Sequence, residues 1–289
     1  MRMRAQGDIR RCSIHAHPEY LPPTSRKIEC ATFMGEKTRI KWTDKTWNPW
    51  IGCTKISEGC AHCYAEKNIA AVRRRGGKVL WGPGMPRART KGWDQVRRWN
   101  RTAQKKGTLI KVFPSLCDVF DSDPEQEKTL DGWRQDLFDL IKETPALSWL
   151  LLTKRPEVAA LPRWAEQIAQ FGPKVWLGTS VENQKTADRR LPILVEQIPS
   201  KNKFVSAEPL LGAVDLSPWL ADVKWVIVGG ESKKNARRME LDWARSIRKQ
   251  CASAGVKFFF KQVGGSDAKN GGNLLDGEAI EEEPDSLTR

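Results

Sequence analysis

The 289-residue chain has few of the features on which membrane and secreted proteins depend. Its longest apolar runs, such as Leu147–Leu152, are far shorter than the roughly 20 residues that a membrane-spanning helix needs. Residues 1–20 are basic and lack the apolar core of a secretory signal peptide. With 39% hydrophobic and 29% charged residues, the composition is that of a globular domain. We therefore expect a cytoplasmic protein with no membrane partner.

Histidine is also scarce, since the chain contains only His15, His17 and His62. A Ser–His–Asp hydrolase needs a histidine base beside a serine and an acid, and no such grouping is visible. Cysteine, in contrast, occurs seven times. Because disulfides are rare in the cytoplasm and seven is an odd number, we expect free thiols or metal ligands.

Acidic residues are almost absent from residues 71–111. This segment holds thirteen Lys or Arg residues and one acid, Asp94, so it carries +12 of the net charge of +14. Such density favours a polyanion partner, DNA or RNA, although a solvated basic insertion fits equally well. Tryptophans interleaved with arginines are typical of single-strand binding, but they also anchor segments to a fold. The candidate nucleic-acid-binding residues are Trp93, Trp99, Arg97, Arg98 and Arg101.

From residue 34 onward, short β-like runs alternate with helix-like runs. The expected strands are Arg39–Thr43, Thr108–Phe113, Leu147–Thr153, Val175–Val181, Lys203–Glu208, Lys224–Gly229 and Val256–Lys261. The expected helices are Pro124–Glu143, Glu157–Phe171, Gln184–Gln197 and Glu240–Ala254. This alternation predicts an α/β fold, a parallel (β/α) barrel or partial TIM-like barrel with a basic insertion between strands one and two. An open doubly wound sheet is the alternative, although no phosphate-binding glycine pattern follows the first strand.

The barrel-like domain is expected to span residues 34–265, with its insertion at 71–111. Residues 1–33 show no periodicity, which indicates a flexible N-terminal arm or a translation start assigned too early. Residues 266–289 are acidic and are predicted to form a solvated, disordered tail.

Polar residues follow the ends of six consecutive expected strands. In a parallel barrel the carboxyl ends of the strands meet at one edge, where ligands bind. We therefore expect one polar site there. The candidate cofactor-binding residues are Asp118, Lys154, Ser180, Glu182 and Glu208. Lys154 has an alternative role in a salt bridge to Glu182 or Glu208.

Three cysteines, Cys53, Cys60 and Cys63, lie in "NPWIGCTKISEGCAHCYAEK", in the loop after the first expected strand. Thiolates bind soft metals, and closely spaced ligands can wrap one face of a cluster. Three thiolates leave one iron of a [4Fe–4S] cluster open. A structural zinc site would need a fourth ligand, for which His62 and Cys117 are candidates. The third interpretation is a trio of small buried residues.

The cysteine loop and the partial barrel resemble the radical S-adenosylmethionine (SAM) superfamily. Residues 34–264 more closely resemble an uncharacterised family of phage and prophage proteins, in "IKWTDKTWNPWIGCTKISEGCAHCYAE", "SLCDVF", "LLTKRP", "VWLGTSVEN", "KFVSAEPLLG", "WVIVGGES" and "GVKFFFKQVG". The resemblance implies a [4Fe–4S] cluster on Cys53, Cys60 and Cys63. It also implies SAM at the open iron and an external electron donor, whose electron would cleave SAM to a 5′-deoxyadenosyl radical.

Two features depart from the superfamily pattern. Six residues separate Cys53 from Cys60, where the superfamily usually has three. The Gly-Gly-Glu motif stands at Gly229–Glu231 on the sixth strand instead of the second, so Asp118 is the substitute ligand for the SAM amino group. The expected function is a radical-SAM-like iron–sulfur enzyme that modifies or repairs nucleic acid or a nucleotide. The alternative is a non-catalytic zinc or iron–sulfur protein that binds nucleic acid.

Overall fold

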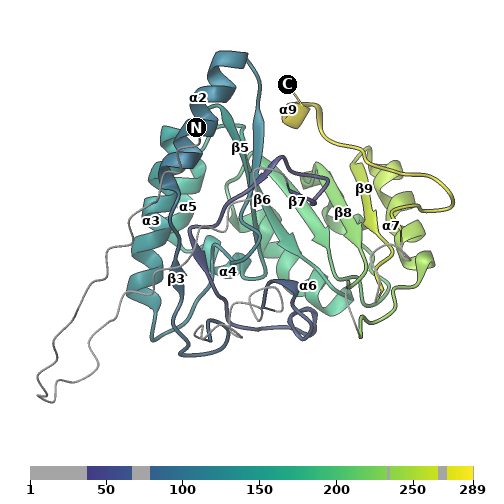
Figure 1. Ribbon diagram of the computed structural model, residues 1–289. Helices are drawn as coiled ribbons and strands as arrows, with labels where there is room; N and C mark the ends of the chain where they lie inside the picture. Colours follow the sequence, from purple (N-terminus) through teal and green to yellow (C-terminus); the bar gives the residue numbers. More distant parts are fainter. Residues whose placement is uncertain (1–37, 67–78, 233–234, 266–271, 289) are drawn as a thin grey trace, which may run out of the picture.

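The computed structural model describes residues 38–66, 79–232, 235–265 and 272–288. Its centre is a curled sheet of seven parallel strands that forms a half-barrel (Figure 1). In spatial order the strands are β1 (Lys45–Thr46), β4 (Ile110–Phe113), β5 (Leu147–Thr153), β6 (Val175–Ser180), β7 (Asn202–Ala207), β8 (Trp225–Gly229) and β9 (Lys257–Gln262). A small antiparallel sheet pairs β2 (Trp50–Ile51) with β3 (Ala88–Arg89).

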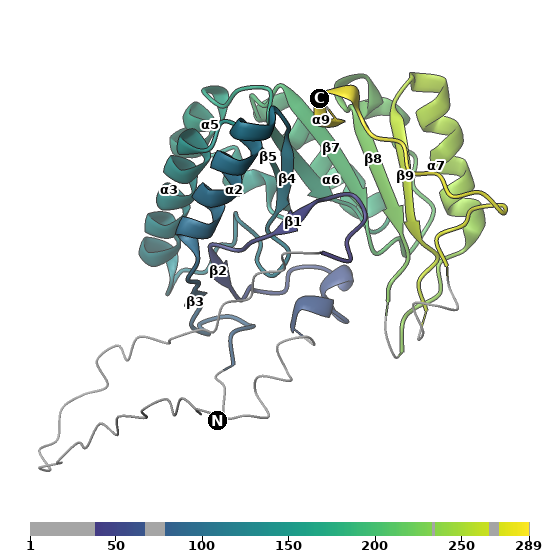
Figure 2. The ribbon, with the colours of Figure 1, turned by 45° about the horizontal axis from the view of Figure 1, so that its top comes forward.

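The longer helices cover the outer face of the half-barrel (Figures 1 and 2). Neighbouring strands of the large sheet follow one another in chain order, and right-handed crossovers then place the connecting helices on one side. The helices are α2 (Trp93–Lys106), α3 (Glu127–Glu143), α4 (Pro156–Ala159), α5 (Pro162–Ala169), α6 (Gln184–Pro192), α7 (Leu241–Ala254) and α9 (Asp285–Thr288), with the 3₁₀ turns η1 (Glu58–Cys60) and η3 (Ser217–Asp222) and the π-turn η2 (Ile193–Gln197). No helix in the described part of the chain is long and apolar enough to cross a bilayer.

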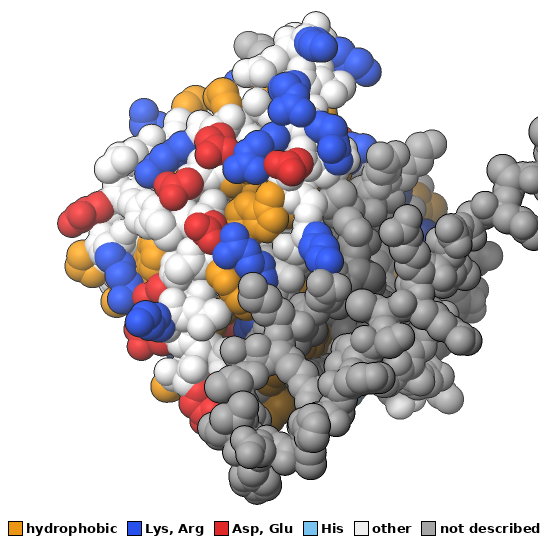
Figure 3. Space-filling model, turned by 60° about the vertical axis from the view of Figure 1, so that its left-hand side comes forward, with side chains coloured by type: hydrophobic (Ala, Val, Ile, Leu, Met, Phe, Trp, Pro, Cys, Tyr) orange, Lys and Arg blue, Asp and Glu red, His pale blue; other side chains and the backbone are white. Residues whose placement is uncertain are grey.

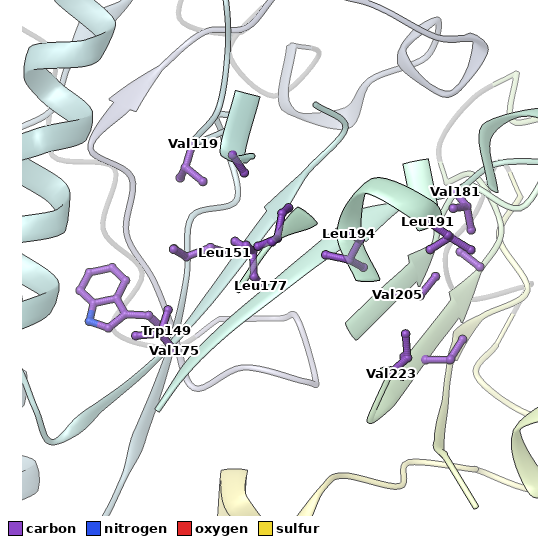
Figure 4. Close-up of a cluster of buried hydrophobic side chains, with 14 of the residues drawn as sticks. Val119, Trp149, Leu151, Val175, Leu177, Val181, Leu191, Leu194, Val205 and Val223 are labelled. Atoms are coloured by element: carbon purple, nitrogen blue, oxygen red, sulfur yellow. The ribbon is translucent and has the colours of Figure 1, made fainter. Parts of the chain in front are cut away.

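Successive residues of each strand face two different cores, because side chains alternate across a sheet. Trp149 and Leu151 of β5 point outward into the main core beneath the helices (Figure 4). Leu150 points inward, into the hollow of the half-barrel. A cluster of aromatic rings fills much of this hollow: Trp42, Phe113, Trp176, Phe204, Trp225 and Phe259. Gly178 on β6 makes room for it, since a Cβ there would lie 2.5 Å from the Phe204 ring.

Six of the expected strands match β4–β9 to within two residues, and the parallel half-barrel agrees with the α/β prediction. The strand order does not reverse, as a doubly wound sheet would require. The first expected strand, Arg39–Thr43, is wrong, because the strand is β1 at Lys45–Thr46. The apolar character of the earlier segment has another cause. Trp42 is buried in the hollow, where the centroid of its ring lies 4.4 Å from the centroid of the Phe113 ring.

Two expected helices are interrupted by proline. The segment Glu157–Phe171 forms α4 and α5 separately, because Pro162 lacks an N–H and begins a new helix. The segment Gln184–Gln197 begins as α6 and ends as the π-turn η2, with Pro192 at the junction.

The described part of the basic segment, residues 79–111, is largely a regular part of the fold. Helix α2 is the crossover helix before β4, and it lies between Gly92 and Gly107, which both have positive φ angles. Its buried face includes Val96 and Trp99. The expected insertion is therefore not confirmed for α2, and residues 71–78 lie outside the described residues.

The acidic C-terminal segment also departs from expectation, because residues 272–288 are not a solvated tail. Leu275, Ile280 and Leu287 are buried, and Glu281 bridges to Phe259 on β9. These apolar side chains, spaced through an acidic sequence, attach the segment to the sheet. Residues 266–271 and the expected arm at 1–33 lie outside the described residues.

Candidate functional site

A cavity of about 200 Å³ opens where the parallel strands end. Apolar side chains from the hollow line one part of it: Ile40, Trp42, Phe113 and Leu152. The sequence-predicted residues that line it are Cys53, Cys60, Cys63, Asp118, Lys154, Ser180 and Glu208. The structure thus brings together residues that are up to 155 positions apart in the sequence. Glu182 is the one predicted cofactor-binding residue that does not line the cavity.

The alternation of side chains explains the polar wall of the cavity. On the inward face of β6, Trp176 is followed by Gly178 and then by Ser180 at the strand end. On β7, Phe204 is followed in the same way by Ser206 and Glu208. On their inward faces, β6 and β7 therefore each place an aromatic residue inside the hollow and polar residues at the carboxyl end, where the cavity opens.

Glu208, directly after β7, is held in place by residues of β7, β8 and β9. Its Oε1 lies 2.7 Å from Lys261 Nζ, and Ser206 Oγ donates to its Oε2 at 3.3 Å. A Cβ on Gly229 would lie 2.6 Å from Glu208 Oε1, so the first glycine of the Gly-Gly-Glu motif leaves room for this carboxylate. The result is a largely buried ion pair on the cavity wall.

The cysteine loop runs from β2 through η1 to Cys63. All three cysteines are free thiols, and Cys60 is buried. Burial raises the pKa of the Cys53 thiol well above its ordinary value; Asp121 adds to this effect and Arg155 opposes it. Burial also raises the pKa of Cys63. Among the described residues, no three or more His, Cys, Asp or Glu side chains converge on one point where a single metal ion could be held. The thiolates of an iron–sulfur cluster each bind a different iron, so they need not converge in this way.

Three buried carboxylates from alternate strand ends anchor this loop. Asp121, after β4, accepts from the Thr54 N–H at 3.2 Å. Glu182, after β6, accepts from Ser57 Oγ at 2.9 Å. Glu231, after β8, pairs with His62 Nδ1 at 2.8 Å. These contacts fix the loop at its beginning, middle and end, so the three cysteines face the cavity.

Glu182 is completely buried, yet it is ionised and fully paired. Its Oε1 lies 2.7 Å from Lys154 Nζ, and its Oε2 lies 2.9 Å from Arg190 Nη1. Burial alone would raise the pKa of Glu182, but Lys154 and Arg190 outweigh it and lower the pKa. The contact with Lys154 is the salt bridge that the sequence offered as that residue's alternative role.

Glu231, the last residue of the Gly-Gly-Glu motif, forms a second charged anchor. Arg237 Nη2 donates to its Oε1 at 2.6 Å and also to the Glu58 carbonyl at 2.9 Å. Burial would raise the pKa of Glu231, but hydrogen bonds from Arg237 and His62 lower it to about 2. The motif therefore supports the cysteine loop from the side of β8.

Asp118 links the turn after β4 to the end of β5 through hydrogen bonds to two backbone N–H groups. Its Oδ1 accepts from the Phe120 N–H at 2.9 Å, and its Oδ2 accepts from the Lys154 N–H at 2.9 Å. Arg155 Nη1 lies 3.2 Å from the same Oδ2. The carboxylate that was expected to receive the SAM amino group thus joins the turn after β4 to the end of β5.

Sequence reasoning missed the remaining charged groups beneath the loop. Asp121 Oδ2 accepts from Arg87 Nε at 2.7 Å, and Arg87 Nη2 donates to Thr54 Oγ1 at 2.6 Å. Asp123 Oδ2 accepts from the Gly84 N–H at 2.8 Å. The three acids of "CDVFDSD" were the available signal, since such a run outside a helix needs partners.

Trp93 and Trp99, the two candidate stacking residues of the basic segment, pack against the core. Trp99 is only 5% exposed, and Lys45 Nζ lies 5.6 Å from the centre of its ring. Trp93 packs edge-on against Trp47, with ring centroids 4.8 Å apart, and Arg89 covers its ring at 4.7 Å. This is the anchoring role that the sequence left open, and stacking of Trp99 on a base would require it to leave the core.

The arginines of α2 lie on the surface among acidic side chains (Figure 3). Arg97 Nε pairs with Glu143 at 2.8 Å. Arg98 donates to Gln95, and Arg101 is exposed. Part of the positive charge on this face is therefore balanced by α3.

Comparison with known proteins identifies one family. The model of the family described as "Protein of unknown function (DUF5131)" matches residues 37–284. No curated protein and no solved structure matches the chain.

Proposed function

The chain belongs to the DUF5131 family, and we propose that it is a radical-SAM-like iron–sulfur enzyme that acts on a nucleic acid or a nucleotide. The observation that carries the proposal is that Cys53, Cys60 and Cys63 all line one cavity at the carboxyl ends of the strands. In barrels of parallel strands, this edge is where catalytic groups gather.

The chemistry of the cysteine loop fits an iron–sulfur cluster. Thiolates are the usual protein ligands of such clusters, and the loop supplies three free thiols to one cavity. Gly59 allows the loop to lie directly on Glu182, because a Cβ there would be 2.5 Å from Glu182 Cγ. A bound [4Fe–4S] cluster would supply one-electron chemistry, with SAM as co-substrate and an external protein as electron donor.

The residues of the chain would hold, orient and shield the reacting groups. Asp121, Glu182 and Glu231 fix the loop and so set the direction of its thiols. The apolar part of the cavity, with Trp42 and Phe113, would exclude water from a bound ligand. Glu208 and Ser180 on the opposite wall would hydrogen-bond its polar groups.

A SAM-cleavage assay tests the proposal. Protein reconstituted anaerobically with iron and sulfide should convert SAM to 5′-deoxyadenosine when dithionite is added, as followed by chromatography. Cys60→Ala should form none, whereas Cys251→Ala, in the core outside the cavity, should keep the activity. Absence of 5′-deoxyadenosine from wild-type protein that carries a full cluster would contradict the proposal.

The nucleic-acid part of the proposal is supported by the net charge of +14 and the exposed arginines of α2. Binding driven by phosphate contacts should weaken steeply with salt, because neutralised phosphates release condensed counterions. Arg98→Glu and Arg101→Glu should weaken binding to all sequences about equally, since phosphate contacts carry no base information. No retention of labelled DNA or RNA at about 50 mM salt would redirect the proposal to a nucleotide substrate.

The alternative function is a non-catalytic protein that binds nucleic acid through the same basic face. Its cysteines would then hold a structural zinc ion or a cluster without SAM chemistry. Metal analysis separates the two functions: stoichiometric zinc with salt-dependent DNA or RNA binding favours the alternative, and a broad brown absorbance with SAM cleavage favours the enzyme.

A further inference from the structure

One buried arginine reaches a cysteine of the loop directly. Arg155 follows β5, is only 3% exposed, and its Nη1 lies 3.7 Å from Cys53 Sγ. Its Nη2 donates to the carbonyl of the next residue, Thr54, at 2.5 Å. One guanidinium therefore contacts both the sulfur of Cys53 and the backbone that carries it.

The position of this guanidinium is fixed by acids on its other side. Asp118 Oδ2 and Asp121 Oδ1 each lie 3.2 Å from it. Burial would lower the pKa of Arg155, but Asp118, Cys53 and Asp121 outweigh it and raise the pKa above its ordinary value. Arg155 is therefore a permanent positive charge, and moving away from Cys53 would cost it its contacts with both carboxylates.

The contact distinguishes Cys53 from the other two cysteines. The polar neighbour of Cys60 Sγ is the neutral hydroxyl of Ser57, at 3.7 Å. Within the described residues, no guanidinium hydrogen bond is found for Cys60 or Cys63. Cys53 Sγ also lies 3.9 Å from Asp121 Oδ1, so the carboxylate that holds Arg155 is itself close to the sulfur. The three thiols therefore differ in charge environment, although they lie on one loop.

We propose that Arg155 is the positioning residue for Cys53, and that its N–H group, directed at the sulfur, raises the reduction potential of a cluster bound by that thiolate. Hydrogen bonds and positive charge at a ligating sulfur stabilise the reduced, more negative cluster. Reduction adds one electron from an external reductant and breaks no bond. This inference rests on the proposed function, because it requires that the loop holds an iron–sulfur cluster.

The test compares midpoint potentials in reconstituted protein, titrated with dithionite and followed by electron paramagnetic resonance. Arg155→Gln removes the charge and the donor at Cys53, and it should lower the midpoint potential. Arg87→Gln is the matched control, because Arg87 is a buried guanidinium that also pairs with the Asp121 carboxylate, but it contacts Thr54 Oγ1 instead of the sulfur. Its shift should be smaller. Iron content is measured in every sample as the second readout.

The outcomes separate the inference from the function on which it rests. Equal potentials in wild type and Arg155→Gln, or an equal shift in Arg87→Gln, overturn the role of Arg155 while the cluster itself stands. If Arg155→Gln loses iron, the titration is repeated with Arg155→Lys, which keeps the positive charge. A lowered potential in that variant, or loss of iron in both Arg155 variants but not in Arg87→Gln, supports the proposal. Loss of iron in all variants overturns it, and wild-type protein that binds no cluster refutes both.

Discussion

Replacing Glu182 by Gln changes the anchor in the middle of the cysteine loop with little change in shape. In the wild type, Oε1 accepts from Ser57 and Lys154, and Oε2 lies against Arg190. A glutamine has one acceptor oxygen, so its NH₂ group must face either Lys154 or Arg190, both of which are donors. One strong ionic contact is therefore lost in either orientation.

The cost of this change follows from the burial of its partners. Arg190 is 0% exposed, and its Nε and Nη2 have no hydrogen-bond partner among the described residues. Its other contact is the Ser180 carbonyl, at 2.7 Å. Removing one member of a buried ion pair costs about 3–5 kcal/mol, because the remaining charge stays buried without compensation. At about 2–4 °C per kcal/mol, Tm should fall by roughly 6–20 °C.

Thermal and urea unfolding followed by circular dichroism measure this cost. The control is Glu143→Gln, which breaks the exposed pair with Arg97 and should leave Tm nearly unchanged. Reconstituted Glu182→Gln should also bind less iron, because a neutral amide holds Ser57 and the loop less strongly than the carboxylate does. A loss of stability below about 1 kcal/mol, as for an exposed pair, would refute the argument that Glu182 is a buried, ionised anchor.

Three further predictions concern other positions around the loop. The pKa of Glu231 is about 2 in the folded chain, so its stabilising effect is present at neutral pH and is lost as pH falls from about 5 toward 2. The urea midpoint of Glu231→Gln should therefore approach that of the wild type over this range. A difference between the two midpoints that does not change with pH would contradict this. Gly230→Ala should destabilise the fold by at least about 1–3 kcal/mol, since its Cβ would lie 2.0 Å from the Val263 carbonyl oxygen. In the same urea assay, Gly132→Ala in α3 should stabilise the fold by about 0.5–1 kcal/mol, because a Cβ there meets nothing within 4 Å. Cys117→Ala should keep the full iron content if three thiols hold the cluster; loss of iron would make Cys117 a fourth ligand and remove the open iron on which SAM chemistry depends.

The strands and the polar edge of the sheet could be predicted because they depend on local rules. Short apolar runs bounded by polar residues indicated β4–β9, and the carboxyl ends of parallel strands must meet at one edge. Lys154, Ser180 and Glu208 stand at such ends, and this was enough to predict that they share a cavity. The sequence did not reveal that Glu182, in an equivalent position, turns beneath the cysteine loop.

The partners of the loop could not be predicted, because they join residues that are distant in the sequence. Arg87 lies within the basic segment, whose charge indicates a solvated surface, yet it is buried against Asp121. The basic composition of residues 71–111 also indicated an insertion where the structure has the crossover helix α2. Val96, Trp99 and Ala103 nevertheless recur at the helical spacing that marks a buried face. In both places the charge of a segment was a weaker guide than the spacing of its apolar residues.

The most direct test of the central claim is the iron and acid-labile sulfide content of the anaerobically reconstituted protein, measured beside Cys53→Ala, Cys60→Ala and Cys63→Ala. The wild type should bind about four irons and four sulfides per chain, as a [4Fe–4S] cluster requires, and each variant should lose most of both. A Cys60→Ala protein with the full wild-type iron content, or a wild type that takes up no iron, would contradict the claim that the three cysteines of this cavity hold a cluster.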